Sequence, residues 1–298
     1  MNCIVSGGTG FIGSRVVARL MAGRHEVSVW SRRPDREKRT GVRSIAWNPL
    51  VGEPPVESLA EADAVIHLAG EPVAQRWNDE VKRRIRDSRV LGTRHLVDAI
   101  ARVVKKPSAL VCASAIGYYA DRGDEILTES SAPGDGFLAD VCKGWEAEAR
   151  RAAELGIRVI SLRIGFVLGK NGGALKRMGP VFKAGLGGRL GSGKQWMPWI
   201  HIDDLSELFV YAVENEITGV WNASAPNPVT NDEFTRAMGA VLHRPAVFPV
   251  PAFALKLVFG ELGQHMLDSA RVIPEAALRT GFQFRYPEAG GALRAIFG

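Results

Sequence analysis

The feature that most constrains the fold of this chain is a set of three glycines spaced three residues apart. The short apolar run Ile4–Val5 leads into Gly7, Gly10 and Gly13, and an apolar helical stripe follows at positions 11, 16, 17 and 20. A strand, a tight turn and a helix start have this order. The first glycine permits the turn, the second lets the backbone approach a pyrophosphate, and the third allows close helix–strand packing. Because the helix N-terminus would face the phosphates, the pattern predicts a dinucleotide site rather than an ordinary turn.

The residues after the second expected strand, 26–30, indicate which dinucleotide is bound. An NAD site has a carboxylate about twenty residues beyond the glycines, where it holds the ribose 2′-hydroxyl. This chain has Ser31 there, followed by Arg32 and Arg33. A guanidinium pairs with a 2′-phosphate, whereas a carboxylate repels it. A solvated basic loop is the alternative, because positions 36, 38 and 39 are also basic, but the missing acid favours NADP.

The composition is that of a globular protein and excludes several other classes. Of 298 residues, 46% are hydrophobic and 23% are charged, which suits one doubly wound domain with a small lobe. The net charge is +6, but the basic residues are dispersed and no nucleic-acid-binding motif accompanies them. We therefore expect a small-molecule substrate and no nucleic acid. The chain has no apolar run long enough to suggest a membrane span or a secretion signal.

The three cysteines, Cys3, Cys112 and Cys142, are too few and too scattered for a disulfide framework or a zinc site. Cys3 and Cys112 lie in apolar, strand-like runs, which is typical of buried, reduced thiols. We therefore expect a cytoplasmic protein without a bound metal. We interpret Cys142 as a packing residue.

Strand and helix signals alternate through the first half of the chain, which is typical of parallel βαβ units. The expected strands span residues 44–47, 64–70, 109–114 and 158–163, with helices at 78–104 and 137–155. The predicted fold class is α/β, a Rossmann doubly wound parallel sheet with a smaller, mostly helical C-terminal substrate lobe. We place the NADP-binding Rossmann domain at residues 1–168, with residues 200–225 returning to it. The substrate loop and C-terminal lobe occupy residues 169–298.

Several motifs together resemble the extended short-chain dehydrogenase/reductase superfamily. Besides the glycine loop, they are His67–Gly70, Ser114 followed by Tyr118-Tyr119, Leu162–Gly169 and Trp199–Leu205. The chain also resembles the atypical "epimerase family protein" branch, whose members end in a small domain of unknown function. Four motifs carry this resemblance: Ala69–Pro72, Gly191–Gln195, Phe259–Glu261 and Gly281–Phe284. This resemblance spans the chain and implies a Rossmann fold that binds NADP, but it supplies no substrate.

The glycine pattern and the resemblance together give a set of expected cofactor contacts. They lie at the carboxyl ends of the strands, the edge at which such folds bind ligands. The expected contacts are Gly7, Thr9, Gly10, Phe11, Ile12, Gly13, Ser31, Arg32, Arg33, Leu68, Ala69, Gly70 and Val167.

The chain departs from the superfamily at its Tyr-x-x-x-Lys pair, in which tyrosine exchanges the proton and lysine holds the nicotinamide ribose. None of the four tyrosines has a lysine four residues later. If Glu146 matches the glutamate that often follows the pair, Leu138 and Cys142 occupy its two positions. A frame one residue later gives Ala139 and Lys143. In either frame the usual acid is absent.

Substitute groups are present nearby. We expect Ser114, Tyr118 and Tyr119 to be catalytic, with the alternative that the two tyrosines only wall the nicotinamide pocket. Expected substrate contacts are Glu71, Arg163, Lys194 and Trp199, although Glu71 also suits a loop role and Arg163 a paired structural role.

Two other motifs favour structural interpretations. Gly188–Gln195 nearly spells a phosphate-binding P-loop, but its last residue is Gln instead of the Ser or Thr that binds magnesium. His201, Asp203 and Asp204 resemble a helix-entry segment, so we expect one of the two aspartates to cap a helix.

Two functions fit these observations. The first is an NADP(H)-dependent oxidoreductase or hydride-shuttling epimerase that acts on a small polar substrate. The alternative is a non-catalytic NADP-binding regulatory or sensor protein, which the missing Tyr-x-x-x-Lys pair favours. A homodimer is compatible with either function, and we expect no membrane partner.

Overall fold

The structure, a computed structural model of the chain, describes residues 1–36 and 39–298. Lys38, one of the basic residues after Arg33, lies outside the described residues. The strands are β1 (Asn2–Ser6), β2 (Glu26–Ser31), β3 (Val42–Ala46), β4 (Ala64–His67), β5 (Ala109–Ala115), β6 (Ile126–Leu127), β7 (Arg158–Ile164), β8 (Phe166–Leu168), β9 (Trp196–Met197), β10 (Trp199–His201), β11 (Gly219–Ala223), β12 (Val229–Thr230) and β13 (Arg271–Val272).

The helices follow the strands along the chain. The α-helices are α1 (Phe11–Ala22), α2 (Val56–Ala60), α3 (Asp79–Arg102), α4 (Phe137–Arg150), α5 (Leu175–Lys183), α6 (Ile202–Glu214), α7 (Asn231–Leu242), α8 (Ala252–Phe259), α9 (Glu261–His265), α10 (Glu275–Arg279) and α11 (Ala289–Phe297). The 3-10 helices are η1 (Pro34–Arg36), η2 (Ile116–Tyr118) and η3 (Arg151–Leu155).

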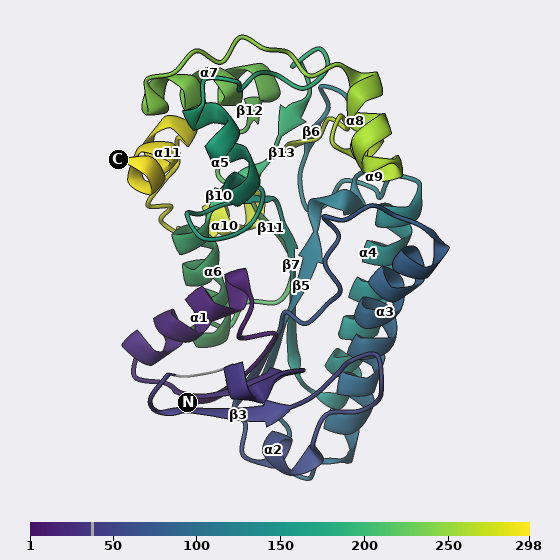
Figure 1. Cartoon of the computed structure of the whole chain (residues 1–298). Helices are drawn as coiled ribbons and strands as arrows, with labels where there is room; N and C mark the ends of the chain where they lie inside the picture. The colour runs from purple at the N-terminus through teal and green to yellow at the C-terminus, as the bar shows by residue number, and fades with distance from the viewer. Residues whose placement is uncertain (37–38) are drawn as a thin grey trace.

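The central sheet is parallel throughout. Within the described residues it has seven strands in the order β11-β7-β5-β4-β1-β2-β3. The order reverses at β1, because the chain first builds outward through β2 and β3 and then crosses to β4 and the strands beyond it. Such a reversal leaves a crevice at the carboxyl ends of the strands, where doubly wound folds bind their ligands. The predicted α/β fold class is confirmed (Figure 1).

Helices cover both faces of this sheet, with α1 and α6 on one face and α2, α3 and α4 on the other (Figure 1). Successive strand residues therefore enter different cores. In β2, Val29 packs in the cluster that includes α1 and α6, whereas Trp30 packs with Leu96 and Ile100 of α3. Burial on both faces explains why these strands are nearly continuous runs of apolar residues.

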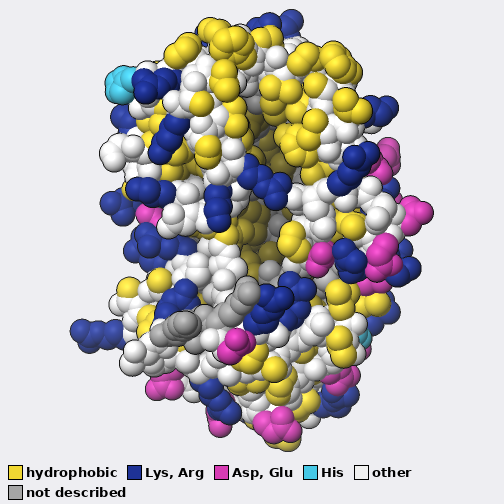
Figure 2. Space-filling model, in the orientation of Figure 1, with side chains coloured by type: hydrophobic (Ala, Val, Ile, Leu, Met, Phe, Trp, Pro, Cys, Tyr) yellow, Lys and Arg dark blue, Asp and Glu magenta, His cyan; other side chains and the backbone are white. Residues whose placement is uncertain are grey.

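The C-terminal part of the chain forms a smaller region above the sheet (Figure 1). Its core joins α5, α7 and α11 through side chains that include Phe182, Phe234 and Leu293. Short pairings of β10 with β8 and of β13 with β6 connect this region to the sheet domain. Figure 2 shows a hollow between the two parts, with hydrophobic side chains along its walls.

The entry to α6 differs from the sequence expectation. Neither aspartate caps the helix, because the N-cap is His201, whose Nδ1 accepts the N–H of Asp203 at 3.1 Å. The Asp203 carboxylate accepts instead from Arg15 at 2.6 Å. The Asp204 carboxylate accepts the N–H groups of Arg285 and Tyr286, each at 2.9 Å. Both carboxylates therefore join separate segments rather than end a helix.

All three cysteines are buried and free of disulfides. No helix in residues 1–36 and 39–298 has the length and apolar character needed to cross a membrane. Over the same residues, no group of three or more His, Cys, Asp or Glu side chains is arranged to hold a metal ion.

Candidate functional site

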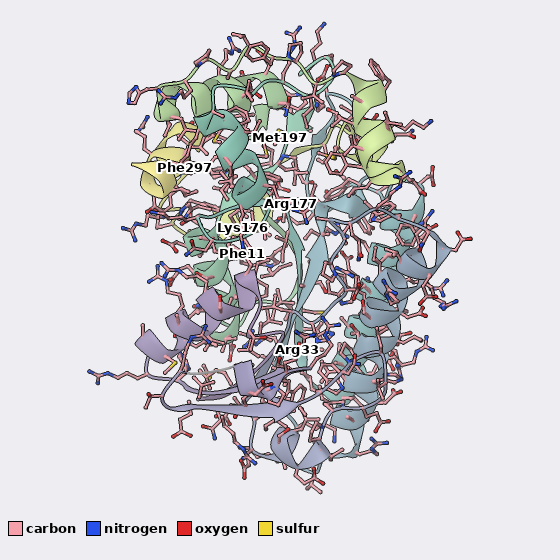
Figure 3. All side chains as sticks on the ribbon, in the orientation of Figure 1. Phe11, Arg33, Lys176, Arg177, Met197 and Phe297 are labelled. Carbon is pink, nitrogen blue, oxygen red and sulfur yellow. The ribbon has the colours of Figure 1, made fainter. Side chains whose placement is uncertain are left out.

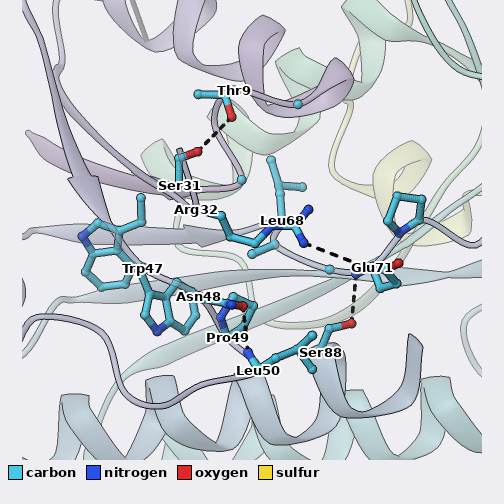
Figure 4. Close-up of a pocket in the computed structure, with 16 residues that line it drawn as sticks. Thr9, Ser31, Arg32, Trp47, Asn48, Pro49, Leu50, Leu68, Glu71 and Ser88 are labelled. Carbon is cyan, nitrogen blue, oxygen red and sulfur yellow. Dashed lines mark hydrogen bonds and ion pairs between the residues drawn. The ribbon is translucent and has the colours of Figure 1, made fainter. Parts of the chain in front are cut away.

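A pocket of about 250 Å³ opens at the carboxyl ends of β1, β2 and β4 (Figure 4). Eight of the expected cofactor contacts line it: Gly7, Thr9, Gly10, Ser31, Arg32, Leu68, Ala69 and Gly70. The remaining five are not among its described lining residues: Phe11, Ile12, Gly13, Arg33 and Val167. Phe11 packs against the segment that leads into α5, where a Cβ on Gly172 would lie 2.3 Å from its ring (Figure 3). Val167 packs against the main hydrophobic core.

The glycine turn has the geometry that a phosphate cradle requires. Gly7 has a φ of +70°, which favours glycine, and a Cβ on Gly13 would lie 2.3 Å from the Gly7 carbonyl oxygen. Gly10 is the N-cap of α1 and gives it no side-chain cap. The first N–H groups of α1 therefore remain free for an anion beside the pocket, where the helix dipole also favours negative charge.

The end of β2 forms a cationic corner of the pocket. The Ser31 hydroxyl lies 3.2 Å from Thr9 Oγ1 and accepts the N–H of Arg33 at 3.1 Å, which holds this turn in place. Arg32 extends over the pocket with 56% of its side chain exposed, and its Nη1 lies 3.9 Å from Glu71 Oε2 (Figure 4). Arg33 is exposed. The end of β2 therefore presents a serine and the Arg32 guanidinium where an NAD site has a carboxylate, which suits a 2′-phosphate.

Sequence reasoning missed the opposite wall of the pocket. Trp47, Asn48, Pro49 and Leu50 form it, directly after β3 (Figure 4). Their position after a strand is the signal that could have found them, because every strand of a doubly wound sheet ends at the same edge. The ring of Trp47 packs 5.4 Å from Trp30, which fixes the wall.

Beneath this wall lies His67, the last residue of β4. It is fully buried, and its Nδ1 lies 2.7 Å from the Ser6 hydroxyl. Burial, aided by the charge of Arg89, lowers the pKa of His67 to about 3. The ring is therefore neutral at physiological pH and packs beneath the residues that line the pocket.

A second polar cluster lies at the end of β5. Ser114 Oγ donates to Glu146 Oε1 at 2.6 Å. Arg163 donates to Glu146 Oε1 from Nε at 2.8 Å and to Oε2 from Nη2 at 2.9 Å. The Arg163 and Glu146 side chains are only 3% and 4% exposed. Burial lowers the pKa of Arg163, but the hydrogen bonds and charge of Glu146 outweigh it, so the guanidinium stays charged.

Two tyrosines flank this cluster in different ways. Tyr119 is fully buried: its hydroxyl donates to Asn222 Oδ1 at 2.7 Å and accepts from Arg163 Nη1 at 2.9 Å. Burial raises the pKa of Tyr119, against the opposing charge of Arg163. Tyr118 is half-buried, and Arg163 Cζ lies 3.3 Å from the centre of its ring. Among the described residues, nothing hydrogen-bonds to the Tyr118 hydroxyl, which leaves it free for a substrate.

The two frames for the missing Tyr-x-x-x-Lys pair can be compared on α4. A Cβ on Gly117, just beyond β5, would lie 3.2 Å from Leu138 Cβ, so Leu138 lies against the end of β5. Cys142, one helical turn later, is buried, and its Sγ donates to the Ala115 carbonyl at 3.6 Å. Burial raises the pKa of Cys142 to about 11. Lys143 instead pairs with Asp140 at 2.6 Å on the outer side of the helix. This geometry favours the frame in which Leu138 and Cys142 replace the pair.

The expected substrate contacts do not come together at one place. Arg163 is occupied by Glu146 and Tyr119, which argues against its binding an anionic substrate. Trp199 is fully buried and donates from Nε1 to the Asn227 carbonyl at 3.1 Å, so its ring belongs to the core of the C-terminal region. Lys194 is exposed. Glu71 lies at the rim of the cofactor pocket beside Arg32.

Comparison with known families gives two matches. The sequence profile of the NAD dependent epimerase/dehydratase family matches residues 3–224. A domain of unknown function, DUF1731, matches residues 250–296. The resemblance inferred from the motifs is confirmed over both parts of the chain.

Individual relatives match along nearly the whole chain. An epimerase family protein from Arabidopsis thaliana, the SDR39U1 homolog described as chloroplastic, is 41% identical over 99% of this chain and 86% of its own length. YfhF of Bacillus subtilis, also an epimerase family protein, is 36% identical over 99% of this chain and 98% of its own. The crystal structure of the human epimerase family protein SDR39U1 with NADPH has a TM-score of 0.89 and 37% identity, and covers 99% of each chain.

Proposed function

The chain belongs to the NAD dependent epimerase/dehydratase family, and from that premise we propose that it is an NADP(H)-dependent oxidoreductase or hydride-shuttling epimerase. Two observations support NADP(H) as the cofactor: the open N-terminus of α1 beside the pocket, and Arg32 next to Ser31 where an NAD site has a carboxylate. That a human relative crystallises with NADPH agrees with this choice.

The observation that carries the catalytic part of the proposal is the free hydroxyl of Tyr118 beside a buried cation. NADPH, when bound, supplies a hydride to a carbonyl carbon. Tyr118 donates the proton to the carbonyl oxygen. The Arg163 guanidinium, 3.3 Å from the centre of the Tyr118 ring, stabilises the negative charge that remains on the phenol. The same proton transfer in reverse serves the oxidation step of an epimerase.

The buried groups around Tyr118 hold it in position. Glu146 fixes Arg163 through two hydrogen bonds, and the Ser114 hydroxyl donates a hydrogen bond to the same carboxylate. Tyr119 anchors the other side of Arg163. We therefore assign Tyr118 the catalytic role, and we assign Ser114 and Tyr119 roles as positioning residues.

Figure 2 bears on the class of substrate. Hydrophobic side chains line the hollow between the sheet domain and the C-terminal region. We propose a small carbonyl compound whose reacting end is polar and whose remainder is partly apolar, because apolar walls stabilise apolar ligand surface. This extends the small polar substrate expected from the sequence.

The second candidate is an NADP(H)-binding sensor without catalysis. The geometry of α4 favours this function, because Leu138 and Cys142 fit the positions of the usual tyrosine and lysine. Leu138 has no proton to donate, and Cys142 is a buried thiol whose pKa is raised. Such a protein binds NADP(H) and presents a different conformation to a partner when the cofactor is bound, but it does not oxidise NADPH or reduce NADP.

A steady-state screen for NADPH consumption distinguishes the two functions. The panel contains aliphatic and aromatic aldehydes and ketones together with sugar nucleotides, and NADPH absorbance is followed with and without protein. Oxidation of NADPH by one class of carbonyl compound supports the enzyme. Tight NADPH binding without consumption across the panel supports the sensor.

A further inference from the structure

On the basis of the proposed NADP(H) site, we propose that Arg89 of α3 supplies the cation that holds the nicotinamide-side phosphate and ribose of the cofactor. In the superfamily's Tyr-x-x-x-Lys pair the lysine holds the nicotinamide ribose, and the geometry of α4 favours Cys142 at that position. The positive charge would thus come from a different helix.

Within the described part of the chain, Arg89 has no carboxylate in direct contact, although the charge of Glu71 acts on it from a greater distance. Its Nη1 donates to the carbonyls of Glu71 and Ile85 at 3.0 and 3.1 Å. Its Cζ lies 5.1 Å from the centre of the Trp145 ring. Among the described residues, no carboxylate lies within 4.0 Å of its guanidinium, and no group hydrogen-bonds to Nε or Nη2. A half-buried guanidinium with no anion in direct contact is costly, so it points to a ligand that provides negative charge.

The position of Arg89 directs this charge at the cofactor loop. A Cβ on Gly70 would lie 3.2 Å from Arg89 Cζ, so the guanidinium touches the backbone of the loop that follows β4. The preceding residue, Ser88, lines the pocket and accepts the N–H of Glu71 at 2.9 Å. The charge of Arg89 also acts on Cys142. Arg89 therefore lies between the loop at Gly70 and Cys142, the residue at the position of the superfamily's lysine.

The chemistry of the group suits a diphosphate flanked by ribose hydroxyls. A guanidinium has several donors in a fixed plane and can bind phosphate oxygens in a bidentate manner. The 2′-phosphate lies at the opposite corner, with Arg32. Arg89 and Arg32 would thus hold two separate anionic groups of one cofactor.

Two ligands test this assignment by calorimetric titration: NADPH, and 2′,5′-ADP, which lacks the second phosphate and the nicotinamide ribose. Arg89→Met keeps the apolar stem that packs on Trp145 and removes the charge. We expect it to weaken NADPH binding about ten- to a hundredfold, as for loss of a charged hydrogen-bond donor, and to leave 2′,5′-ADP binding within about twofold. Arg86→Met, an exposed position on the same helix paired with Asp87, is the matched control and should change neither.

The other outcomes overturn the inference. Unchanged NADPH binding in Arg89→Met means that the cation does not meet the cofactor. Equal weakening of NADPH binding and 2′,5′-ADP binding means that Arg89 only stabilises the loop through its hydrogen bond to the Glu71 carbonyl. If the wild-type protein binds neither ligand, the proposed NADP(H) site itself is wrong and this inference falls with it. The failure of the site and the failure of Arg89 are distinguishable: if wild-type protein binds 2′,5′-ADP and Arg32→Ser weakens that binding, the proposed site holds whatever Arg89→Met does.

Discussion

Replacing Arg32 with serine should remove most of the discrimination between NADPH and NADH. A hydrogen bond to a charged group contributes about 1.5–3 kcal/mol. Because 56% of the Arg32 side chain is exposed, solvent screening places the value at the low end of that range, about 1.5 kcal/mol. The contact with Glu71 at 3.9 Å is long and costs little to break. We therefore expect NADPH binding to weaken about tenfold, with NADH binding unchanged.

Isothermal titration calorimetry with both cofactors measures this directly. Arg43→Ser is the matched control, because Arg43 is exposed on β3 and pairs with Glu61 away from the pocket. Arg32→Asp should reverse the preference, since a carboxylate repels the 2′-phosphate and accepts from a 2′-hydroxyl. Glu71→Gln should strengthen NADPH binding a few-fold by removing the competing anion. Equal dissociation constants for NADPH and NADH in the wild-type protein would refute the reasoning.

Three further predictions test the fold and the site. Glu146→Gln leaves Arg163 buried without a counter-charge and should lower the free energy of unfolding by about 3–5 kcal/mol, measured by urea denaturation; a loss below about 1 kcal/mol would contradict the buried pair. Gly10→Val should abolish NADPH binding with the far-ultraviolet dichroism unchanged, because a side chain at the N-cap of α1 enters the phosphate cradle; normal titration by NADPH would place the phosphates elsewhere. Burial lowers the pKa of His67 to about 3 and that of His201 to about 4. Between pH values of about 6.5, the ordinary pKa of histidine, and about 4, the unfolded chain therefore binds more protons than the folded one, and the free energy of unfolding should fall as the pH is lowered. Urea midpoints that stay constant across this range would show that these rings are not buried as neutral groups.

The glycine turn could be predicted because each of its constraints is local in sequence. Gly7 needs a positive φ and Gly13 has no room for a Cβ, and both requirements come from residues within the same turn. The alternation of apolar runs and amphipathic stretches likewise predicts the parallel sheet, since each βαβ unit is local.

The polar cluster at β5 could not be predicted in this way. Ser114 and Arg163 meet because they are register partners across β5 and β7, and Glu146 reaches both from α4. The pairing depends on how separate strands align, which no local pattern specifies. The same holds for Asp203, whose spacing suggests a cap but whose carboxylate binds the distant Arg15.

The burial of Tyr119 and Trp199 has a similar origin. Both are aromatic residues beside motifs that the superfamily uses at its active site, and proximity in sequence suggested contact with the substrate. Their exposure depends on the C-terminal region, which packs over Trp199, and on Asn222, which accepts from the Tyr119 hydroxyl. Tyr118 directly precedes Tyr119 in the chain, and nothing in the described part of the structure hydrogen-bonds to the Tyr118 hydroxyl.

The most direct test of the central claim is the turnover of Tyr118→Phe with the carbonyl substrate that the NADPH screen identifies. We predict a fall in kcat of at least about tenfold, because a positioned general acid contributes about 10²–10⁴-fold, with the dissociation constant for NADPH unchanged. Cys142→Ser, which changes a buried packing thiol on the neighbouring helix, should keep most of the activity. Wild-type turnover by Tyr118→Phe, or loss of turnover in Cys142→Ser alone, would contradict Tyr118 as the proton donor.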